Sequence, residues 1–554
     1  DRSPSRGLGD VYKRQILGIC CSSSLLLSSC IEETFPTNSA TDEQLTSSSK
    51  ATEALLWAMP AFVNDYKTWN AGDYDWGYGS IMHVRDVMTE EMVINESNYD
   101  HYSAWEHNQY IGPNYLTTQW IWNYFWKFVQ TSNKLIAGVD PNTTDETLLG
   151  YLGAAYGYRA FIYLDMARMF EFLENDKISS VNSNGNDVLH LTVPIVTESI
   201  TEEEARNNPR VSREKMLEFI EGDLDKAEEY IKYFSRPKKT LPDLACIYGL
   251  KARLYMWVED YAKAKEYARK AIDTGNYVPT NKADWTNTTS GFNDISATSW
   301  MWGASVQKED DVVKSGIINW TSWMSGEAAY GYAGAGPVPM ADVRFYNKIS
   351  DKDFRKLSWK APKGSALESQ NEYCNPSSAV DMAEYASLKF RPGSGNVSDY
   401  NVGSATSFPL MRIEEMYFIE AEAAAHLNAS DGVSLINSFM KGYRYPSYEC
   451  KVTNQDDVVE EIVFQKRVEL WGEGQSFFDI KRLNLPVTRA YEGSMHHAIG
   501  RFNTTTRPAW MNICIVQTEE NNNKALLGYE NPDPSDCYKA VSYTHLRAHE
   551  TDSY

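Results

Sequence analysis

The fold is decided by the stretch from Thr240 to Tyr277, which reads TLPDLACIYGLKARLYMWVEDYAKAKEYARKAIDTGNY. Small and aromatic residues recur in it at intervals of three and four, at Ala245, Tyr248, Gly249, Ala252, Tyr255 and Met256, and again at Ala264, Ala268, Ala271 and Ile272. This spacing predicts two helices joined by a turn at Glu259 and Asp260. Thr240 to Asp243 can cap the first helix, and Gly275 can end the second. Small residues let two helices approach closely, as in the tetratricopeptide unit of about 34 residues.

One such helix pair cannot bury its own apolar face, so we expect further helices to stack on it. Helical patterns recur along the chain at 51–63, 116–138, 146–171, 212–233, 408–427 and 456–483. Ser212 can cap the fourth of these segments. The sequence therefore predicts a mostly α fold, built as a stack of tetratricopeptide-like helix pairs.

Composition limits the classes of partner. The chain has 554 residues, a hydrophobic share of 42% and a formal net charge of −22. The hydrophobic share permits a normal core. The negative charge argues against nucleic acid or an anionic membrane surface as partner, because both would be repelled. We therefore expect neutral molecules or proteins as partners.

The N-terminal region carries an export signal. Lys13 and Arg14 precede an apolar run from Ile16 to Leu27, which is too short to span a bilayer but suits a signal peptide. Leu27-Ser28-Ser29-Cys30 resembles the bacterial lipobox, in which the cysteine becomes the lipidated first residue of the mature protein. We expect a lipoprotein signal peptide at 16–29, lipidation of Cys30 and a flexible, Ser/Thr-rich tether at 30–50. The alternative is an ordinary thiol behind a standard cleavage site.

The two ends resemble translated sequencing adapter. These segments are residues 1–15, DRSPSRGLGDVYKRQ, and residues 541–554, VSYTHLRAHETDSY. We expect both to be artefacts and leave them out of the fold prediction. Lys13 and Arg14 are then weak support for a signal peptide.

Aromatic residues gather in stretches without helical spacing. The segment Trp69–Gly79 is too rich in glycine for a helix and is predicted to be a loop that displays aromatic rings, and tryptophans after Asn281 lie among Gly, Asn, Ser and Thr. A sugar ring can lie with its C–H face on an indole while its hydroxyls meet polar side chains. Contact over roughly 100 Å² supplies about 2 to 3 kcal/mol before ordering costs.

We therefore take the loop tryptophans and nearby polar residues as candidate ligand-binding residues. They are Trp76, Arg85, Trp105, Asn108, Trp300, Trp302, Trp320 and Trp323, with Asp75 as a further polar companion. The alternative for each tryptophan is that it only pins its own loop.

Several dispersed motifs carry a family resemblance. Residues 461–484, EIVFQKRVELWGEGQSFFDIKRLN, resemble the C-terminal motif of the SusD/RagB family, with Gln465 standing where glutamate is commoner. Further agreement is found in DKDFR at 351–355, with Asp353 and Arg355, in MRIEEMYFIEAEAAAHL from Met411, and in the closing segment QTEENNNKALLGYENPDPS. The resemblance covers roughly residues 30–536. In the family's starch binders an Arg, a Trp and an Asn three residues on help to form the site, an order that Arg85, Trp105 and Asn108 loosely match.

This resemblance implies a fold and a function. The family is a right-handed stack of tetratricopeptide-like helices that supports a loop-rich, ligand-binding half. Its members are non-catalytic surface lipoproteins of the outer membrane that bind oligosaccharides and cap a SusC-like TonB-dependent transporter. The motif charges are expected to be structural: Arg412, Glu415, Glu422, Arg467, Glu469 and Asp479. We expect a helical part at 51–280, a loop-rich part at 281–405 and a C-terminal family part at 406–540.

Other functions remain open at the level of sequence. The RagB branch of the family takes peptides, helical repeats also serve as protein scaffolds, and plentiful carboxylates leave room for a helical glycoside hydrolase. No GxSxG, HExxH, Walker or GxGxxG motif is present, so we expect no enzyme and no cofactor. The cysteines lack a CxxC motif, and the histidines lack ligand spacing, so no metal is expected either.

Overall fold

A computed structural model describes residues 49–67, 69, 71–94 and 100–541 of the chain. The expectations for the N-terminal adapter, the signal peptide and lipidated Cys30 lie outside these residues. Almost all of the tether and of the C-terminal adapter segment lies outside them as well.

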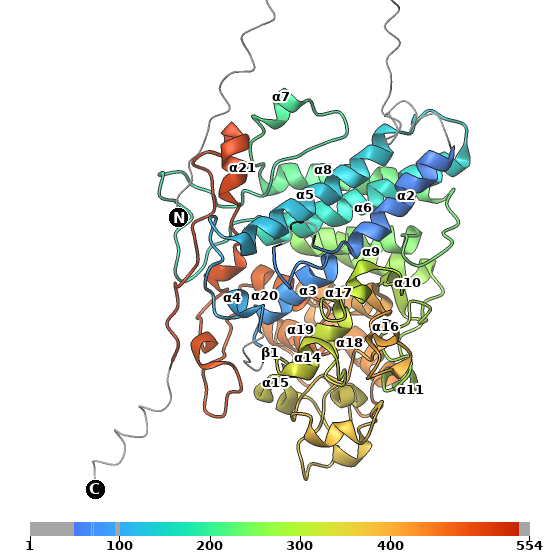
Figure 1. The fold of residues 1–554 in the computed structure, drawn as a ribbon, viewed down its shortest axis with the longest axis vertical. Helices are drawn as coiled ribbons and strands as arrows, with labels where there is room; N and C mark the ends of the chain where they lie inside the picture. Colours follow the sequence, from blue (N-terminus) through green and yellow to red (C-terminus); the bar gives the residue numbers. More distant parts are fainter. Residues whose placement is uncertain (1–48, 68, 70, 95–99, 542–554) are drawn as a thin grey trace, which may run out of the picture.

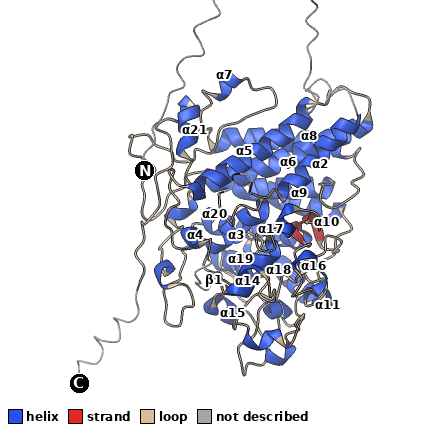
Figure 2. Ribbon diagram, in the orientation of Figure 1, coloured by secondary structure: helices blue, strands red, loops and turns tan. Residues whose placement is uncertain are grey.

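The described chain is mostly helical, as predicted (Figures 1 and 2). The longer helices are α2 (Ser49–Val63), α3 (Tyr78–Val87), α5 (Leu116–Ala137), α6 (Glu146–Phe170), α8 (Arg213–Ile231), α9 (Leu244–Trp257), α10 (Tyr261–Thr274), α17 (Ile413–Leu427), α18 (Ala429–Tyr443), α19 (Gln455–Glu469) and α20 (Ser476–Arg482). The shorter ones are α4 (Ser103–Glu106), α7 (Glu202–Ala205), α11 (Lys282–Trp285), α12 (Asp311–Lys314), α13 (Trp320–Met324), α14 (Gly331–Ala335), α15 (Val343–Lys348), α16 (Tyr400–Gly403) and α21 (Gln517–Asn522).

The predicted central pair forms α9 and α10. The Asp243 side chain caps α9 by accepting a hydrogen bond from the backbone N–H of Cys246 at 3.0 Å, and Asp260 caps α10 in the same way. Gly249 shows why a small residue is needed, since a Cβ there would lie 2.4 Å from the sulfur of Met411. The helix face that carries the small residues therefore packs against neighbouring elements, as the spacing predicts.

Other helices stack on this pair in sequence order. Helices α2, α5, α6 and α8 pack on one another on one side of the pair, and α17, α18 and α19 continue the stack beyond α10 (Figure 1). The Ser212 side chain caps α8, as expected. Helix α18 was not predicted. The chain thus forms the stacked helix pairs that one amphipathic pair requires.

Two predicted helices are wrong in part. Residues Ser407–Arg412 form strand β4 before α17 begins, and the segment predicted as one helix at 456–483 is two helices, α19 and α20. Gly472 and Gly474 lie in the turn between them with φ of 76° and 67°, a conformation that glycine adopts without steric cost. The turn lets the backbone N–H of Gly474 reach the Asp86 carboxylate at 3.0 Å, which connects α20 to α3.

Two small antiparallel sheets join segments far apart in sequence. Strand β1 (Met92–Ile94) pairs with β3 (Pro339–Ala341), and β2 (Trp300–Ser305) pairs with β4. Ser305 lies opposite Ser407, so residues 306–406 leave and rejoin the stack at one place.

Buried charges hold the C-terminal half together. The Glu469 carboxylate accepts two hydrogen bonds of 2.7 Å from Arg444, one of 3.2 Å from Arg412 and one of 3.1 Å from Arg355. All four side chains are fully buried. The other motif charges are paired too: Glu415 with Arg253, Glu422 with Arg482, Arg467 with Glu91, and Asp479 with Lys466. These are the contacts expected of structural residues.

Among the described residues, no helix combines the length and the apolar character needed to cross a lipid bilayer.

Candidate functional site

A surface loop next to α3 displays aromatic and charged side chains. The loop is shaped by buried Asp75, whose carboxylate accepts hydrogen bonds from the backbone N–H groups of Trp69 at 2.9 Å and Ala71 at 3.4 Å. Gly77 ends the loop with φ of 88°, which favours glycine. This bracing leaves the Trp69 side chain 43% exposed. Asp75 is therefore a support of the loop and not the ligand companion that we expected.

Five further residues lie on or around this loop. Asp73 lies 3.4 Å from the Lys67 ammonium and 3.9 Å from His101, and it accepts a hydrogen bond from the Tyr332 hydroxyl. The Lys67 ammonium lies 5.9 Å from the centre of the Tyr66 ring. We call this set the aromatic patch: Tyr66, Lys67, Trp69, Asp73, His101 and Tyr332. Burial lowers the pKa of His101, with Asp73 opposing the shift, so its ring is neutral at pH 7.

A groove adjoins the patch at Tyr66. Its volume is about 390 Å³, and Trp57, Asn64, Asp65, Gln307 and Asp310 are among the residues that line it. The rings of Trp57 and Tyr66 are both half-buried. The groove has the size of a small-molecule site, and its mostly polar wall offers two aromatic rings beside amide and carboxylate groups.

The eight candidate residues chosen from sequence are all buried. Trp76, Arg85, Trp105, Asn108, Trp300, Trp302, Trp320 and Trp323 are each at most 2% exposed. The expectation that these tryptophans are displayed is therefore wrong. Irregular backbone does not imply an exposed side chain, because loops that cover a core send their large apolar residues into it.

Four of these tryptophans lie in one buried cluster with Tyr102. The Trp76 indole donates a hydrogen bond of 2.8 Å to the Tyr102 hydroxyl, and the Tyr102 ring packs against Trp105 and Trp323. Trp320 packs against Trp76. Trp323 also stacks on Tyr332 with ring centres 4.2 Å apart, and Tyr332 lies 4.9 Å from the His101 ring. The cluster therefore supports the patch from below.

The remaining candidates lie elsewhere in the core. Trp300 and Trp302 belong to β2. The Trp302 ring packs against Tyr158 and Phe161 of α6, and its indole donates to the Thr240 carbonyl at 3.0 Å. Arg85 pairs with Asp165 at 2.6 Å. Asn108 donates to the Pro534 carbonyl at 2.9 Å. Each of these side chains is held by internal partners.

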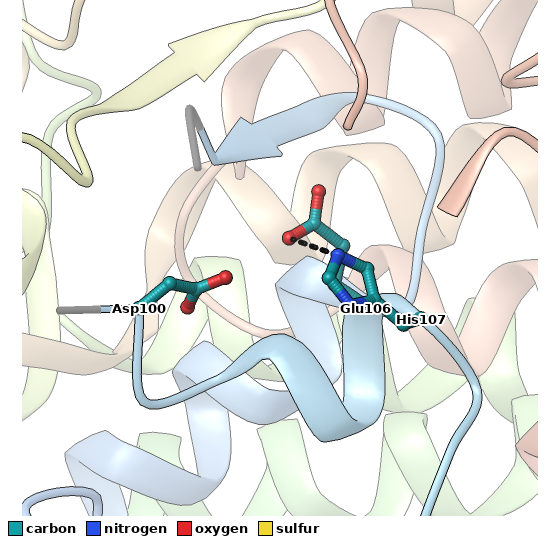
Figure 3. Close-up of side chains that lie close together, drawn as sticks. All are labelled: Asp100, Glu106 and His107. Atoms are coloured by element: carbon teal, nitrogen blue, oxygen red, sulfur yellow. Dashed lines mark ion pairs between the residues drawn. The ribbon is translucent and has the colours of Figure 1, made fainter. Parts of the chain in front are cut away.

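One group of side chains has the composition of a cation site (Figure 3). Asp100, Glu106 and His107 each offer a ligand atom, and these atoms lie within 4.8 Å of one another. The His107 ring also meets His497, with 3.0 Å between their nitrogens. Burial, together with His497 and Arg489, lowers the pKa of His107 to about 4, which keeps the ring neutral at pH 7. A search for regularly spaced histidines does not find this group, because it contains one histidine and two carboxylates.

The sequence matches a known family model. Residues 255–538 match the model described as the SusD family. The chain is similar to SusD-like protein P2 of Formosa agariphila, with 24% identity over 391 residues that cover 66% of this chain and 71% of the relative. It is also similar to SusD-like protein P38 of the same organism, with 22% identity and coverage of 83% and 90%.

The fold matches solved structures as well. A SusD-like carbohydrate binding protein from Bacteroides vulgatus superposes with a TM-score of 0.68 at 22% identity, covering 86% of this chain and 96% of the other. A SusD superfamily protein from Bacteroides thetaiotaomicron gives a TM-score of 0.64 at 18% identity, covering 86% and 98%. At these identities the likeness concerns the fold.

Proposed function

The chain belongs to the SusD family, and from this premise we propose that it binds oligosaccharides at the aromatic patch and the adjoining groove without altering them. Proteins of this family generally bind nutrients and do not catalyse reactions. One of the similar structures is described as a carbohydrate binding protein. The observation that carries the proposal is an exposed Trp69 on the same loop as Asp73, whose carboxylate lies 3.9 Å from the His101 ring.

Each part of the patch has a role in this proposal. Trp69 and Tyr66 provide flat apolar surfaces for the C–H faces of sugar rings, each worth about 2 to 3 kcal/mol before ordering costs. Asp73, Lys67 and neutral His101 lie within reach of sugar hydroxyls. Trp323 supports the site from below through Tyr332. Two or three such platforms hold an oligomer more firmly than one.

The proposed cellular setting rests on the family premise and on the predicted N-terminal signal. We propose that lipidated Cys30 anchors the protein at the outer membrane and that it delivers its ligand to a SusC-like TonB-dependent transporter. A stable contact with that transporter needs more than about 1,200 Å² of buried surface.

The test is binding of a glycan panel, measured by native affinity gels and by calorimetry, with the Trp69→Ala variant. We expect the variant to lose at least about tenfold in affinity, as an exposed aromatic anchor would. Tyr529→Ala is the matched control because Tyr529 is similarly exposed, at 42%, and belongs to the C-terminal segment.

The same assays separate the rival functions. Unchanged glycan affinity in Trp69→Ala would refute the assignment of the site. Binding of peptides but not of glycans would indicate a RagB-type protein. Release of reducing sugar from the panel would indicate a glycoside hydrolase.

A further inference from the structure

A second cavity lies where the N-terminal and C-terminal helices meet. Its volume is about 130 Å³, and its wall is formed by the ends of α6 and α9, the start of α8, and residues of α17, α19 and α20. It shares none of its lining residues with the aromatic patch. A cavity of about 150 Å³ holds one benzene molecule, so this one suits a single small ligand.

The wall of this cavity is rich in positive charge. Seven Arg and Lys side chains line it against four carboxylates. The cations are Arg168, Arg213, Arg253, Lys466, Lys481, Arg482 and Arg507, and the carboxylates are Glu171, Glu259, Glu415 and Asp479. This excess is unexpected in a chain whose formal net charge is −22.

Most carboxylates of the wall already have partners. Glu415 accepts two hydrogen bonds from Arg253, and Asp479 pairs with Lys466 at 2.9 Å. Glu171 accepts from Arg213 at 2.6 Å and from the Trp257 indole at 2.8 Å. These carboxylates therefore balance other cations of the wall.

Three cations of the wall are left with incomplete or neutral partners. The Lys481 ammonium donates to two carbonyls, those of Met169 at 2.8 Å and Glu171 at 2.7 Å. The Arg507 guanidinium donates to the Asn484 amide oxygen at 3.0 Å. Arg482 pairs with Glu422 and Asp479 through Nη2, but its buried Nη1 has no hydrogen-bond partner among the described residues.

Burial makes the charges of Lys481 and Arg507 costly. The pKa values of Lys481 and Arg507 are both lowered, in each case chiefly by burial. A buried N–H donor without a partner carries a similar penalty. An anion in the cavity would relieve both penalties at once, by supplying negative charge and hydrogen-bond acceptors.

The cavity is also reachable from solvent. His190 and Glu259 on its wall are exposed, and Arg213 and Arg507 are partly exposed. By contrast, Arg482 and Lys481 are buried. A ligand can therefore enter past Arg507 and reach the buried cations.

We propose that this cavity binds a small oxyanion, bridged by Lys481, Arg482 and Arg507. Sulfate, phosphate or a simple carboxylate has the size and the acceptor geometry that the three donors require. The bound anion thereby joins α20, which carries Lys481 and Arg482, to the later segment that carries Arg507. The site is separate from the aromatic patch, so its test is independent of glycan binding.

The experiment is equilibrium dialysis of the whole protein with radiolabelled phosphate and sulfate, at an ionic strength held constant with NaCl because salt screens exposed charges. We expect saturable binding of one anion per chain. Unlabelled glucuronate is the competitor that distinguishes the carboxylate of an acidic sugar from a free inorganic anion as the ligand.

The matched variants are Arg507→Gln, Arg507→Lys and Arg206→Gln. Arg507 is chosen because it lies at the partly exposed mouth, where a substitution leaves the buried core intact. Arg507→Gln should weaken binding at least about tenfold, and Arg507→Lys should restore part of it because the charge is kept. Arg206, which is exposed and paired with Glu202, lies outside the cavity, so Arg206→Gln should bind as the parent does. Absence of saturable binding, or equal affinity of Arg507→Gln and the parent, would overturn the proposal.

Discussion

The aromatic patch and the charged cluster around Glu469 reverse the usual placement of side chains. At the patch the large aromatic Trp69 is exposed, whereas at Glu469 a carboxylate and three arginines are fully buried. The cluster can be buried because each charged group lies 2.7 to 3.2 Å from partners of opposite charge. The patch can leave a ring outside because buried Asp75 fixes its backbone. In this chain, buried charge serves stability, and exposed aromatic surface is available for binding.

The largest effect is expected from Glu469→Gln. This change removes the charge that three buried arginines share, so the free energy of unfolding should fall by about 3 to 5 kcal/mol. Urea denaturation measures it, with exposed Glu460→Gln as control.

The same group predicts a dependence on pH. The neighbouring arginines lower the pKa of Glu469, so its contribution to the free energy of unfolding is present above pH about 4.5 and is lost as pH falls toward the lowered value. A loss below 1 kcal/mol would show that the cluster is not what stabilises this half.

The next-largest effect is a difference in the free energy of unfolding between substitutions of two tryptophans in the same region. Trp323 is fully buried under the patch, so Trp323→Ala should lower the free energy of unfolding by about 3 to 5 kcal/mol. Trp69→Ala should change it by less than about 0.5 kcal/mol, as surface substitutions usually do. Thermal and urea unfolding of both variants give the comparison. Equal losses would mean that Trp69 is part of the core.

A smaller effect is expected from Asp73→Asn. The change keeps the shape of the side chain but removes the charge that attracts Lys67 and His101. Glycan affinity should fall about threefold to tenfold, while the free energy of unfolding changes by no more than about 1 kcal/mol. Calorimetric titration measures the affinity. Asp284→Asn, on exposed α11, is the control.

The smallest effect depends on pH and concerns Glu520 on α21. Burial, and then Glu530, raise the pKa of Glu520 to about 7. The folded chain therefore prefers the protonated carboxyl, and a stability penalty grows between pH about 4.5 and about 7. Glu520→Gln removes this penalty, so the variant should gain up to about 1 kcal/mol above pH 7, after screening of a half-exposed group, and nothing at pH 4. Melting curves across this pH range, with Glu203→Gln as control, provide the test.

The sequence predicted elements whose information is local. Helix α8 begins one residue after the predicted cap Ser212, because spacing and capping act within a few turns. Strands β2 and β4 were missed because they are almost wholly buried, do not alternate between buried and exposed residues, and pair across about a hundred residues of sequence. Glycines at positive φ broke the predicted helix at 456–483 for a reason that periodicity does not reveal.

The candidate site was harder to predict for a related reason. Composition showed that loops near Trp69 and after Asn281 are rich in aromatic residues, but not which rings turn inward. Tyr102 contacts three of the candidate tryptophans in the core, and these contacts depend on tertiary packing. Lys481 and Arg507 meet at a cavity for the same reason, since no local pattern places them together.

The pairing of Ser305 with Ser407 has a consequence for exchange between relatives. Residues 306–406 begin and end at adjacent points, so a segment of another length can be grafted there without spreading the ends. The grafted segment must still supply two contacts with the scaffold, however. Arg355 donates a hydrogen bond to Glu469, and Lys389 donates one to Glu473 at 2.7 Å. A chimera therefore has to keep these two basic anchors, together with strand β3 and the core residues Trp320 and Trp323, to retain the scaffold. One that loses the anchors leaves buried acidic groups without these partners.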